Sequence, residues 1–145
     1  MSCFLKRTWA EVDADCIEAN YRAIRGYIHE GCKFMAIVKA DAYGHSAPFV
    51  AGEFQRLGAD YFGVSNMEEA LQLRASGITR PILILGYTPA GFAGEMIENE
   101  ITQTVLGLDY AAELSAAAQA AGGTLKVHVK IDTGMSRIGF LYHDA

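Results

Sequence analysis

The sequence is poor in features that mark membrane and secreted proteins. Its longest uninterrupted apolar runs, such as 34–38 and 81–85, are far shorter than the ~20 residues that cross a bilayer. The first residues lack the apolar core of a secretory signal. The three cysteines, Cys3, Cys16 and Cys32, are odd in number and widely spaced, which argues against a disulfide framework. We therefore expect no membrane segment, a cytoplasmic location, and buried or half-buried thiols.

Basic residues and metal-ligand spacing are scarce as well. The chain has 12 Lys and Arg against 17 Asp and Glu, a net charge of -5, and the basic residues stand singly or in pairs. Proteins that bind a nucleic-acid backbone gather basic residues on one face. The four histidines, at positions 29, 45, 128 and 143, do not show the spacing of a metal site. The sequence therefore predicts neither nucleic acid nor a metal as a partner.

Short apolar runs alternate with longer helical patterns, which is typical of strand–helix units around a parallel sheet. The five predicted strands cover residues 34–38, 61–64, 81–85, 102–106 and 126–131. A further alternating segment, 8–12, resembles a strand without a partner among these five. The pattern fits either an open doubly wound sheet or an incomplete (β/α)8 barrel that lacks about three of its units. No glycine-rich loop follows the first strand, which argues against a dinucleotide-binding fold.

Capping chemistry predicts where the helices begin. The predicted starts are Asp13, Asn66, Thr88 with Pro89, and Asp109. Asn66 precedes Glu69 by three residues, so each side chain can accept from the backbone N–H of the other. Pro89 would take the first helical position, where its missing N–H costs nothing. Glycines at 77 and 122 are placed to end two of these helices.

Lys39 stands where the apolar run 34–38 ends, at the carboxyl end of a strand, where parallel-sheet enzymes place reacting groups. Partial withdrawal from water favours the neutral amine, the form that makes a Schiff base with an aldehyde. Tyr43 follows in a turn made flexible by Gly44, so its hydroxyl can reach a phosphate at the mouth of the sheet. The positions of Lys39 and Tyr43 alone fit equally well a surface lysine and a half-buried tyrosine without a functional role.

The last predicted strand has one polar face, which is unusual for a parallel strand. Its apolar residues Val127, Val129 and Ile131 alternate with the polar residues His128, Lys130 and Asp132. The polar face either lines the interior of a barrel or meets water at a sheet edge, and spacing leaves both open. Arg137 lies in the glycine-bearing turn that follows, where it can hold a carboxylate or phenolate or simply lie at the surface.

The segment 36–45, which reads AIVKADAYGH, resembles the cofactor-lysine signature of the alanine racemase family. The segments 7–13, 61–70, 81–86 and 130–135 resemble the same family in order and spacing, so the resemblance extends from about Arg7 to Phe140. Two small departures are Ser46, where glycine commonly follows the histidine, and Ser136 in the turn before Arg137. Neither departure removes a chemical group.

The resemblance implies a TIM-type (β/α)8 barrel that binds pyridoxal 5'-phosphate. Lys39 would form the Schiff base with the cofactor and serve as one acid/base for the alpha proton, Tyr43 would contact the phosphate, and Leu85 would line the pocket. Arg137 would face the phenolic oxygen of the cofactor and the substrate carboxylate. Lys130 matches a position that is carbamylated in many members, where the new carboxylate orients the arginine.

The resemblance further implies the interconversion of L-alanine and D-alanine by a homodimer, which supplies D-alanine for peptidoglycan. Residues 1–145 match the amino-terminal part of the barrel, without its remainder and without the carboxyl-terminal β domain that carries a tyrosine base. Racemisation needs acids and bases on opposite faces of the carbanion, so we expect the chain alone to be inactive or nearly so. Alternatives are a serine or broad-specificity amino-acid racemase, and a non-catalytic pyridoxal-phosphate-binding protein.

Overall fold

The computed structural model describes residues 8–143. Its main sheet has five parallel strands that lie side by side in chain order. They are β1 (Met35–Ile37), β2 (Tyr61–Val64), β3 (Ile82–Ile84), β4 (Ile101–Val105) and β5 (Val127–Val129). A doubly wound sheet reverses its strand order at a switch point, whereas a (β/α)8 barrel keeps chain order throughout. The predicted incomplete barrel is therefore confirmed, and the doubly wound alternative is excluded.

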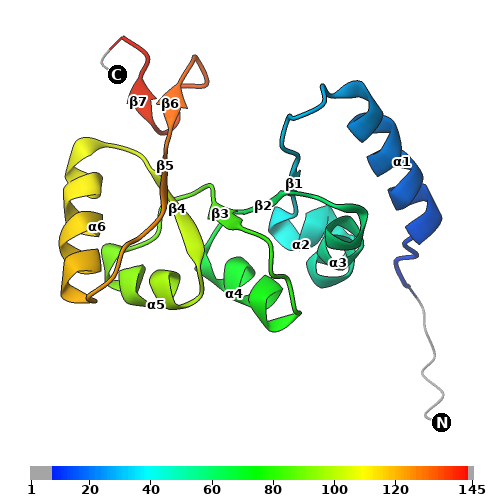
Figure 1. The fold of residues 1–145 in the computed structure, drawn as a ribbon, viewed down its shortest axis with the longest axis horizontal. Coiled ribbons are helices and arrows are strands. Elements are labelled where there is room, and N and C mark those ends of the chain that lie inside the picture. The colour runs from blue at the N-terminus through cyan, green and yellow to red at the C-terminus, as the bar shows by residue number, and fades with distance from the viewer. Residues whose placement is uncertain (1–7, 144–145) are drawn as a thin grey trace.

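The helices connect the strands and lie along their outer side. They are α1 (Ala14–Tyr27), α2 (Lys39–Gly44), α3 (Ala47–Leu57), α4 (Met67–Ala75), the 3-10 helix η1 (Ala90–Phe92), α5 (Ala93–Glu98) and α6 (Leu108–Ala120). In Figure 1, α3 to α6 follow one another in chain order around the strands, and the short pair β6 (Ile131–Asp132) and β7 (Phe140–Leu141) projects beyond β5. None of the helices within residues 8–143 combines the length and apolar character that a bilayer crossing requires.

The core lies between the helices and one face of the sheet. Phe62, Ile82 and Ile101 occupy matching positions on β2, β3 and β4, and each is at most 1% exposed. Leu73 of α4 and Met96 of α5, both fully buried, belong to the same apolar cluster. Burial of a side chain of this size stabilises the fold by about 1.5–3 kcal/mol. This buried face accounts for every second residue of these strands, because side chains alternate between the two faces of a sheet.

The opposite face of the sheet is concave. The rings of Tyr61 on β2 and His128 on β5 lie 6.3 Å apart, although β3 and β4 separate these strands. Neighbouring strands are about 4.8 Å apart, so a flat sheet would hold the two residues about 14 Å apart. The sheet must therefore curl toward this face. His128, from the polar face that the sequence predicted, therefore points to the interior of the curled sheet, while β5 is also its edge strand.

Four predicted strands are confirmed to within a residue at each end, but the fifth is wrong in part. Segment 126–131 breaks at Lys130 into β5 and β6. The break occurs because the Lys130 N–H still donates to Val105 on β4, whereas its carbonyl oxygen accepts from Phe140 of β7. Segment 8–12, which was expected to have no partner among the five strands, forms no strand in the described part of the chain.

The helix starts were predicted with mixed success. The helix expected from about residue 13 is confirmed as α1, and Asp13 caps it, because its carboxylate accepts from two backbone N–H groups of the first turn. Pro89 is the cap residue of η1 and not its first residue. Asp109 caps nothing, because α6 begins one residue earlier with Gly107 as its N-cap. Asp109 still lies in the first turn, where a negative charge suits the helix dipole.

The expected burial of the cysteines is wrong for the two that are described. Cys16 and Cys32 are both exposed and free, and Cys3 lies outside the described residues. The hydrogen bond from the Cys16 thiol to the Asp13 carboxylate raises the pKa of this thiol above its usual value of 9.0. Cys16 is therefore mostly protonated at neutral pH and a poor nucleophile.

Candidate active site

Lys39 begins a left-handed turn at the carboxyl end of β1. The four residues that follow it, Ala40 to Tyr43, all have φ between 52° and 56°. The left-handed conformation costs an L-residue about 1–2 kcal/mol, and none of the four is a glycine. The sequence predicted a turn loosened by Gly44, and it contained no signal for this conformation. Strain of this size persists only where neighbouring groups hold it, as is common at functional sites.

Hydrogen bonds from three directions hold the turn. The Ala42 N–H donates to the Val38 carbonyl oxygen at 2.9 Å, which closes the turn on the end of β1. The Asp41 carboxylate accepts from the N–H of Ala47 at 2.7 Å and so ties the turn to the start of α3. As a result Ala42 is buried, Lys39 is half-buried, and the Tyr43 ring is 62% exposed beside it.

The third contact comes from Glu69 and corrects the predicted capping pair. Asn66 caps α4 as expected, since its side-chain oxygen accepts from the Glu69 N–H at 2.9 Å. The Glu69 carboxylate does not reach back to the N–H of Asn66. Its Oε2 instead accepts from Ser65 at 2.7 Å, and its Oε1 accepts from Ala40 at 2.8 Å. A capping pattern in the sequence identifies hydrogen-bond donors within the same helical turn. It cannot identify the Ala40 N–H, which is 29 residues from Glu69 and is brought to it by the pairing of the strands.

Leu85 lies where β3 ends, in line with β1 and β2. Its N–H donates to Val64 on β2 at 2.8 Å. A Cβ placed on Gly63 would lie 2.6 Å from Cδ1 of Ile37 and 3.4 Å from Cδ1 of Leu85. The side chains of Ile37 and Leu85 therefore close over the space that Gly63 leaves free. They form an apolar floor on the concave face, where Ile37 is the last residue of β1, two residues before Lys39.

The loop after Leu85 is held by hydrogen bonds from two side chains, Gln103 and Tyr110, that sequence analysis missed. Gln103 is fully buried, and its Nε2 donates to the carbonyl oxygens of Gly86 and Thr104, each at 2.8 Å. The Tyr110 hydroxyl donates to the Thr88 carbonyl oxygen at 2.5 Å, and burial raises the pKa of Tyr110 above 10.0. The run of polar residues Thr-Gln-Thr at 102–104, inside a strand predicted to be buried, was the one available signal.

Lys130 and Arg137 come together on the other side of the curled sheet, at the end of β5. Both line a cavity of about 240 Å³ in the β6–β7 loop. The Asp132 carboxylate accepts from Gly134 at 2.9 Å and from Ser136 at 3.0 Å, which lowers the pKa of Asp132 below 3.8. These bonds shape the loop that carries Arg137, whose side chain is exposed.

The five predicted site residues therefore fall into two groups at the carboxyl ends of the strands. Lys39, Tyr43 and Leu85 lie over β1 to β3, whereas Lys130 and Arg137 lie beyond β5. Across residues 8–143 no hydrogen bond or ion pair joins the two groups. Both groups lie at the edge of the sheet where barrel enzymes carry their active sites.

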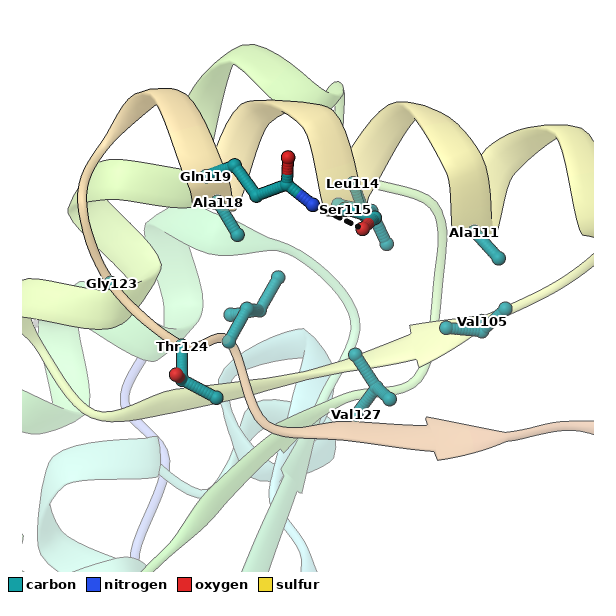
Figure 2. Close-up of a pocket in the computed structure, with 10 residues that line it drawn as sticks. Val105, Ala111, Leu114, Ser115, Ala118, Gln119, Gly123, Thr124 and Val127 are labelled. Carbon is teal, nitrogen blue, oxygen red and sulfur yellow. Dashed lines mark hydrogen bonds between the residues drawn. The ribbon is translucent and has the colours of Figure 1, made fainter.

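A larger cavity lies elsewhere. It measures about 280 Å³ and lies between α6 and strands β4 and β5, on the helix side of the sheet (Figure 2). Leu114 and Ala118 of α6 face Val105 and Val127 across it. None of its ten lining residues carries an ionisable side chain, so this cavity offers no side-chain acid or base.

Comparisons with known proteins agree with this geometry. The family model described as alanine racemase, N-terminal domain, matches residues 12–145. The alanine racemase of Desulfovibrio desulfuricans is 50% identical over 139 residues, which are 96% of this chain and 38% of that protein. Alanine racemase 2 of Caldanaerobacter subterraneus is 47% identical over 97% of this chain and 36% of its own length. The chain thus spans less than two fifths of these relatives.

Solved structures give the same result. An alanine racemase of Clostridium difficile superposes with a TM-score of 0.90 at 42% identity, over 96% of this chain and 37% of that one. A histidine racemase of Leuconostoc mesenteroides superposes with a TM-score of 0.83 at 32% identity, over 90% of this chain and 35% of its own. On the family match and these relatives, the chain belongs to the family of alanine racemase N-terminal domains.

Proposed function

We propose that this chain is the amino-terminal part of the cofactor-binding barrel of a longer, pyridoxal-phosphate-dependent alanine racemase. The observation that carries the proposal is Lys39, half-buried at the carboxyl end of β1 on a strained turn that three other segments hold in place. The family match and the alanine racemases among the relatives support the same reaction. The remainder of the barrel and a carboxyl-terminal β domain would belong to the longer protein.

The side chains of the candidate site fit pyridoxal 5'-phosphate. The Lys39 amine can bind its aldehyde, the exposed Tyr43 hydroxyl can donate to its phosphate, and the apolar floor made by Leu85 suits its ring. The bound cofactor supplies an electron sink that stabilises a carbanion at the substrate alpha carbon. Arg137 would bind the phenolic oxygen of the cofactor and the carboxylate of the amino acid through its planar donors.

Lys39 has the second role of moving a proton. Its Nζ would take the alpha proton from one face of the substrate and return it there in the reverse reaction. Racemisation also needs a group on the opposite face, which we assign to the part of the longer protein beyond this chain. The isolated chain should therefore bind cofactor without appreciable racemase activity.

We propose that Lys130 is carbamylated. Its neutral amine would attack carbon dioxide and lose a proton, which forms an N–C bond and a carboxylate. Lys130 and Arg137 line one cavity, so the new carboxylate would lie where it can orient the guanidinium. Mass spectrometry of the intact protein in bicarbonate, against a Lys130→Ala variant, tests this assignment. An unchanged mass at Lys130 would refute it.

The substrate of the longer protein is proposed to be alanine, with D-alanine made in the cytoplasm by a homodimer for peptidoglycan. The histidine racemase among the structural relatives favours one alternative, a racemase of another or broader amino-acid specificity. A substrate panel of alanine, serine and histidine on the full-length protein separates these candidates. Cofactor binding without alpha-proton exchange on any of them would favour a non-catalytic pyridoxal-phosphate-binding protein.

The first test is borohydride reduction of the purified chain with pyridoxal phosphate, followed by peptide mass mapping of every lysine. We expect stoichiometric labelling at Lys39 and only the weak labelling of an ordinary amine at the other lysines, because Lys39 is half-buried on a turn that neighbouring segments hold in place. Lys39→Ala should abolish the labelling. Scattered or absent labelling would contradict the site, and racemase activity of the isolated chain that Lys39→Ala abolishes would contradict the need for a second base.

A further inference from the structure

Glu69 joins the ends of two neighbouring strands with one carboxylate. Its Oε1 accepts from the backbone N–H of Ala40, just past β1, at 2.8 Å. Its Oε2 accepts from the backbone N–H of Ser65, just past β2, at 2.7 Å. Hydrogen bonds to an ionised carboxylate are shorter and about twice as strong as those between neutral groups. The two donors are therefore held at a set separation by a single charged group.

The position of this carboxylate is itself fixed by α4. The Glu69 N–H donates to the capping oxygen of Asn66 at 2.9 Å, so Glu69 stands in the first turn of that helix. Met67 and Ala70, on either side of Glu69 in the chain, are buried and anchor the turn to the core. The side chain of Glu69 is thus mounted on a packed element and not on a loop.

The contact with Ala40 acts on the backbone of Lys39. The N–H of Ala40 lies in the rigid peptide plane that links it to Lys39. Holding the direction of this N–H therefore restricts rotation about the bond from Cα to the carbonyl carbon of Lys39. This torsion determines how the left-handed turn leaves the strand, so the backbone of Lys39 is held between β1 on one side and the fixed Ala40 N–H on the other.

The other contacts of the turn cannot replace Glu69. Among the hydrogen bonds described for residues 40–45, those of Asp41 and His45 end within the same segment or at the start of α3. Glu69 alone among them brings a side chain from another strand–helix unit. It therefore sets the turn relative to β2 and, through β2, to the apolar floor at Leu85.

We infer that Glu69 is a positioning residue for Lys39: its carboxylate, bonded to Ala40 and Ser65, holds the cofactor lysine in the orientation that receives pyridoxal phosphate. This role rests on the proposed function, because it assumes that Lys39 binds the cofactor. Glu69 touches neither cofactor nor substrate in this assignment. It acts through the peptide bond that follows Lys39.

The test is the rate of pyridoxal-phosphate labelling at Lys39, trapped by borohydride in the full-length protein that contains this chain. The variant is Glu69→Gln, which keeps the shape but presents an NH2 group to one of the two N–H donors. The matched control is Glu68→Gln, which removes the same charge from an exposed position in the same helical turn. Labelling of the exposed Lys126 serves as the internal reference.

We expect the ratio of Lys39 to Lys126 labelling to fall at least about tenfold in Glu69→Gln, the effect of losing one charge-assisted hydrogen bond, and to stay unchanged in Glu68→Gln. A general loss of folding would also lower this ratio, but it would change the circular dichroism spectrum, which we expect to stay that of the wild type in Glu69→Gln. An unchanged ratio in Glu69→Gln, with Lys39 labelled normally in the wild type, would overturn the inference alone. Absence of preferred Lys39 labelling in the wild type would overturn the proposed function and this role with it.

A second measurement needs no variant and therefore does not depend on whether Glu69→Gln folds. Amide hydrogen exchange in the wild-type protein should show that the N–H groups of Ala40 and Ser65 are protected, because both are bonded to Glu69. Exchange of the Ala40 amide at the rate of an open loop would overturn the inference whatever the labelling result.

Discussion

The Lys39 turn and the Arg137 loop both follow parallel strands, but they are held in different ways. The Lys39 turn is bonded to β1, to α3 and to Glu69 of α4, so its conformation depends on residues up to 29 positions away. The Arg137 loop is shaped mainly by Asp132, two to four residues from its partners. The first is preorganised by the fold described here. The second has a local shape that its own neighbouring residues set.

The largest expected effect comes from crowding the ends of β2 and β3. A Cβ on Gly86 would lie 2.6 Å from the Ser65 carbonyl oxygen, a backbone atom that cannot swing aside. Gly86→Ala should lower the free energy of unfolding of the full-length protein by about 3 kcal/mol, as overpacking does. Gly52→Ala in α3 is the matched control, since a Cβ there meets nothing within 4 Å. Equal stability of the two variants in urea would show that this part of the site is not tightly packed.

A smaller loss is expected when the support behind Leu85 is weakened. Tyr110→Phe removes the hydroxyl that donates to the Thr88 carbonyl oxygen and accepts from its N–H, and Thr88 is buried. Leaving these groups unpaired should cost about 2 kcal/mol in urea unfolding. Tyr87→Phe is the control, because Tyr87 is 57% exposed and its ring stacks on Tyr110 at 4.9 Å. A similar loss in both variants would mean that the hydrogen bonds between Tyr110 and Thr88 are not its cause.

The Arg137 loop should respond locally. Gly139 has φ of 120°, and a Cβ there would lie 2.9 Å from the Lys130 carbonyl oxygen, so Gly139→Ala must distort the loop. We expect the unfolding free energy to change by less than about 1 kcal/mol, since the loop is exposed and can open by itself. Amide exchange at Phe140 should accelerate at the same time. Loss of the whole fold would mean that the two regions are coupled more strongly than their contacts indicate.

The smallest effect is a pH dependence of the same loop. The N–H groups of Ser136 and Gly134 hold the pKa of Asp132 below its usual 3.8. A carboxyl whose pKa is lower in the folded state stabilises that state above 3.8. This contribution fades as the pH falls below 3.8 and is lost once the pH passes the folded-state pKa. An NMR titration of the Gly134 and Ser136 amides should follow Asp132, and a midpoint at or above 3.8 would contradict the assignment.

The helix and strand pattern was largely predictable because it depends on local chemistry. Strands buried on both faces are continuous apolar runs, and such runs located β1 to β4 to within a residue. The cap at Asp13 was readable for the same reason, since its donors are in the next turn. The predicted start at Asp109 was wrong, because this residue type is a good N-cap but lies two positions after the actual N-cap, Gly107.

The candidate site was predictable only in part. Lys39 and Arg137 were identified from strand ends and family resemblance, yet nothing in the sequence indicated four left-handed residues without a glycine among them. Glu69 was assigned to its own helix because a capping motif cannot reveal a second donor 29 residues earlier. Gln103 was overlooked because its partners, the carbonyl oxygens of Gly86 and Thr104, include one 17 residues away that no local pattern indicates.

By itself the sequence determined the order of the elements, the apolar faces of the strands and the chemical groups at their ends, because these depend on neighbouring residues and on burial. The tertiary structure decided the rest. Curling of the sheet brought Tyr61 of β2 against His128 of β5 and so assigned the polar face of β5 to the interior. Parallel pairing of β1 and β2 brought Ala40 within reach of Glu69. Such contacts join residues far apart in the chain, and no local pattern specifies which N–H a carboxylate will meet.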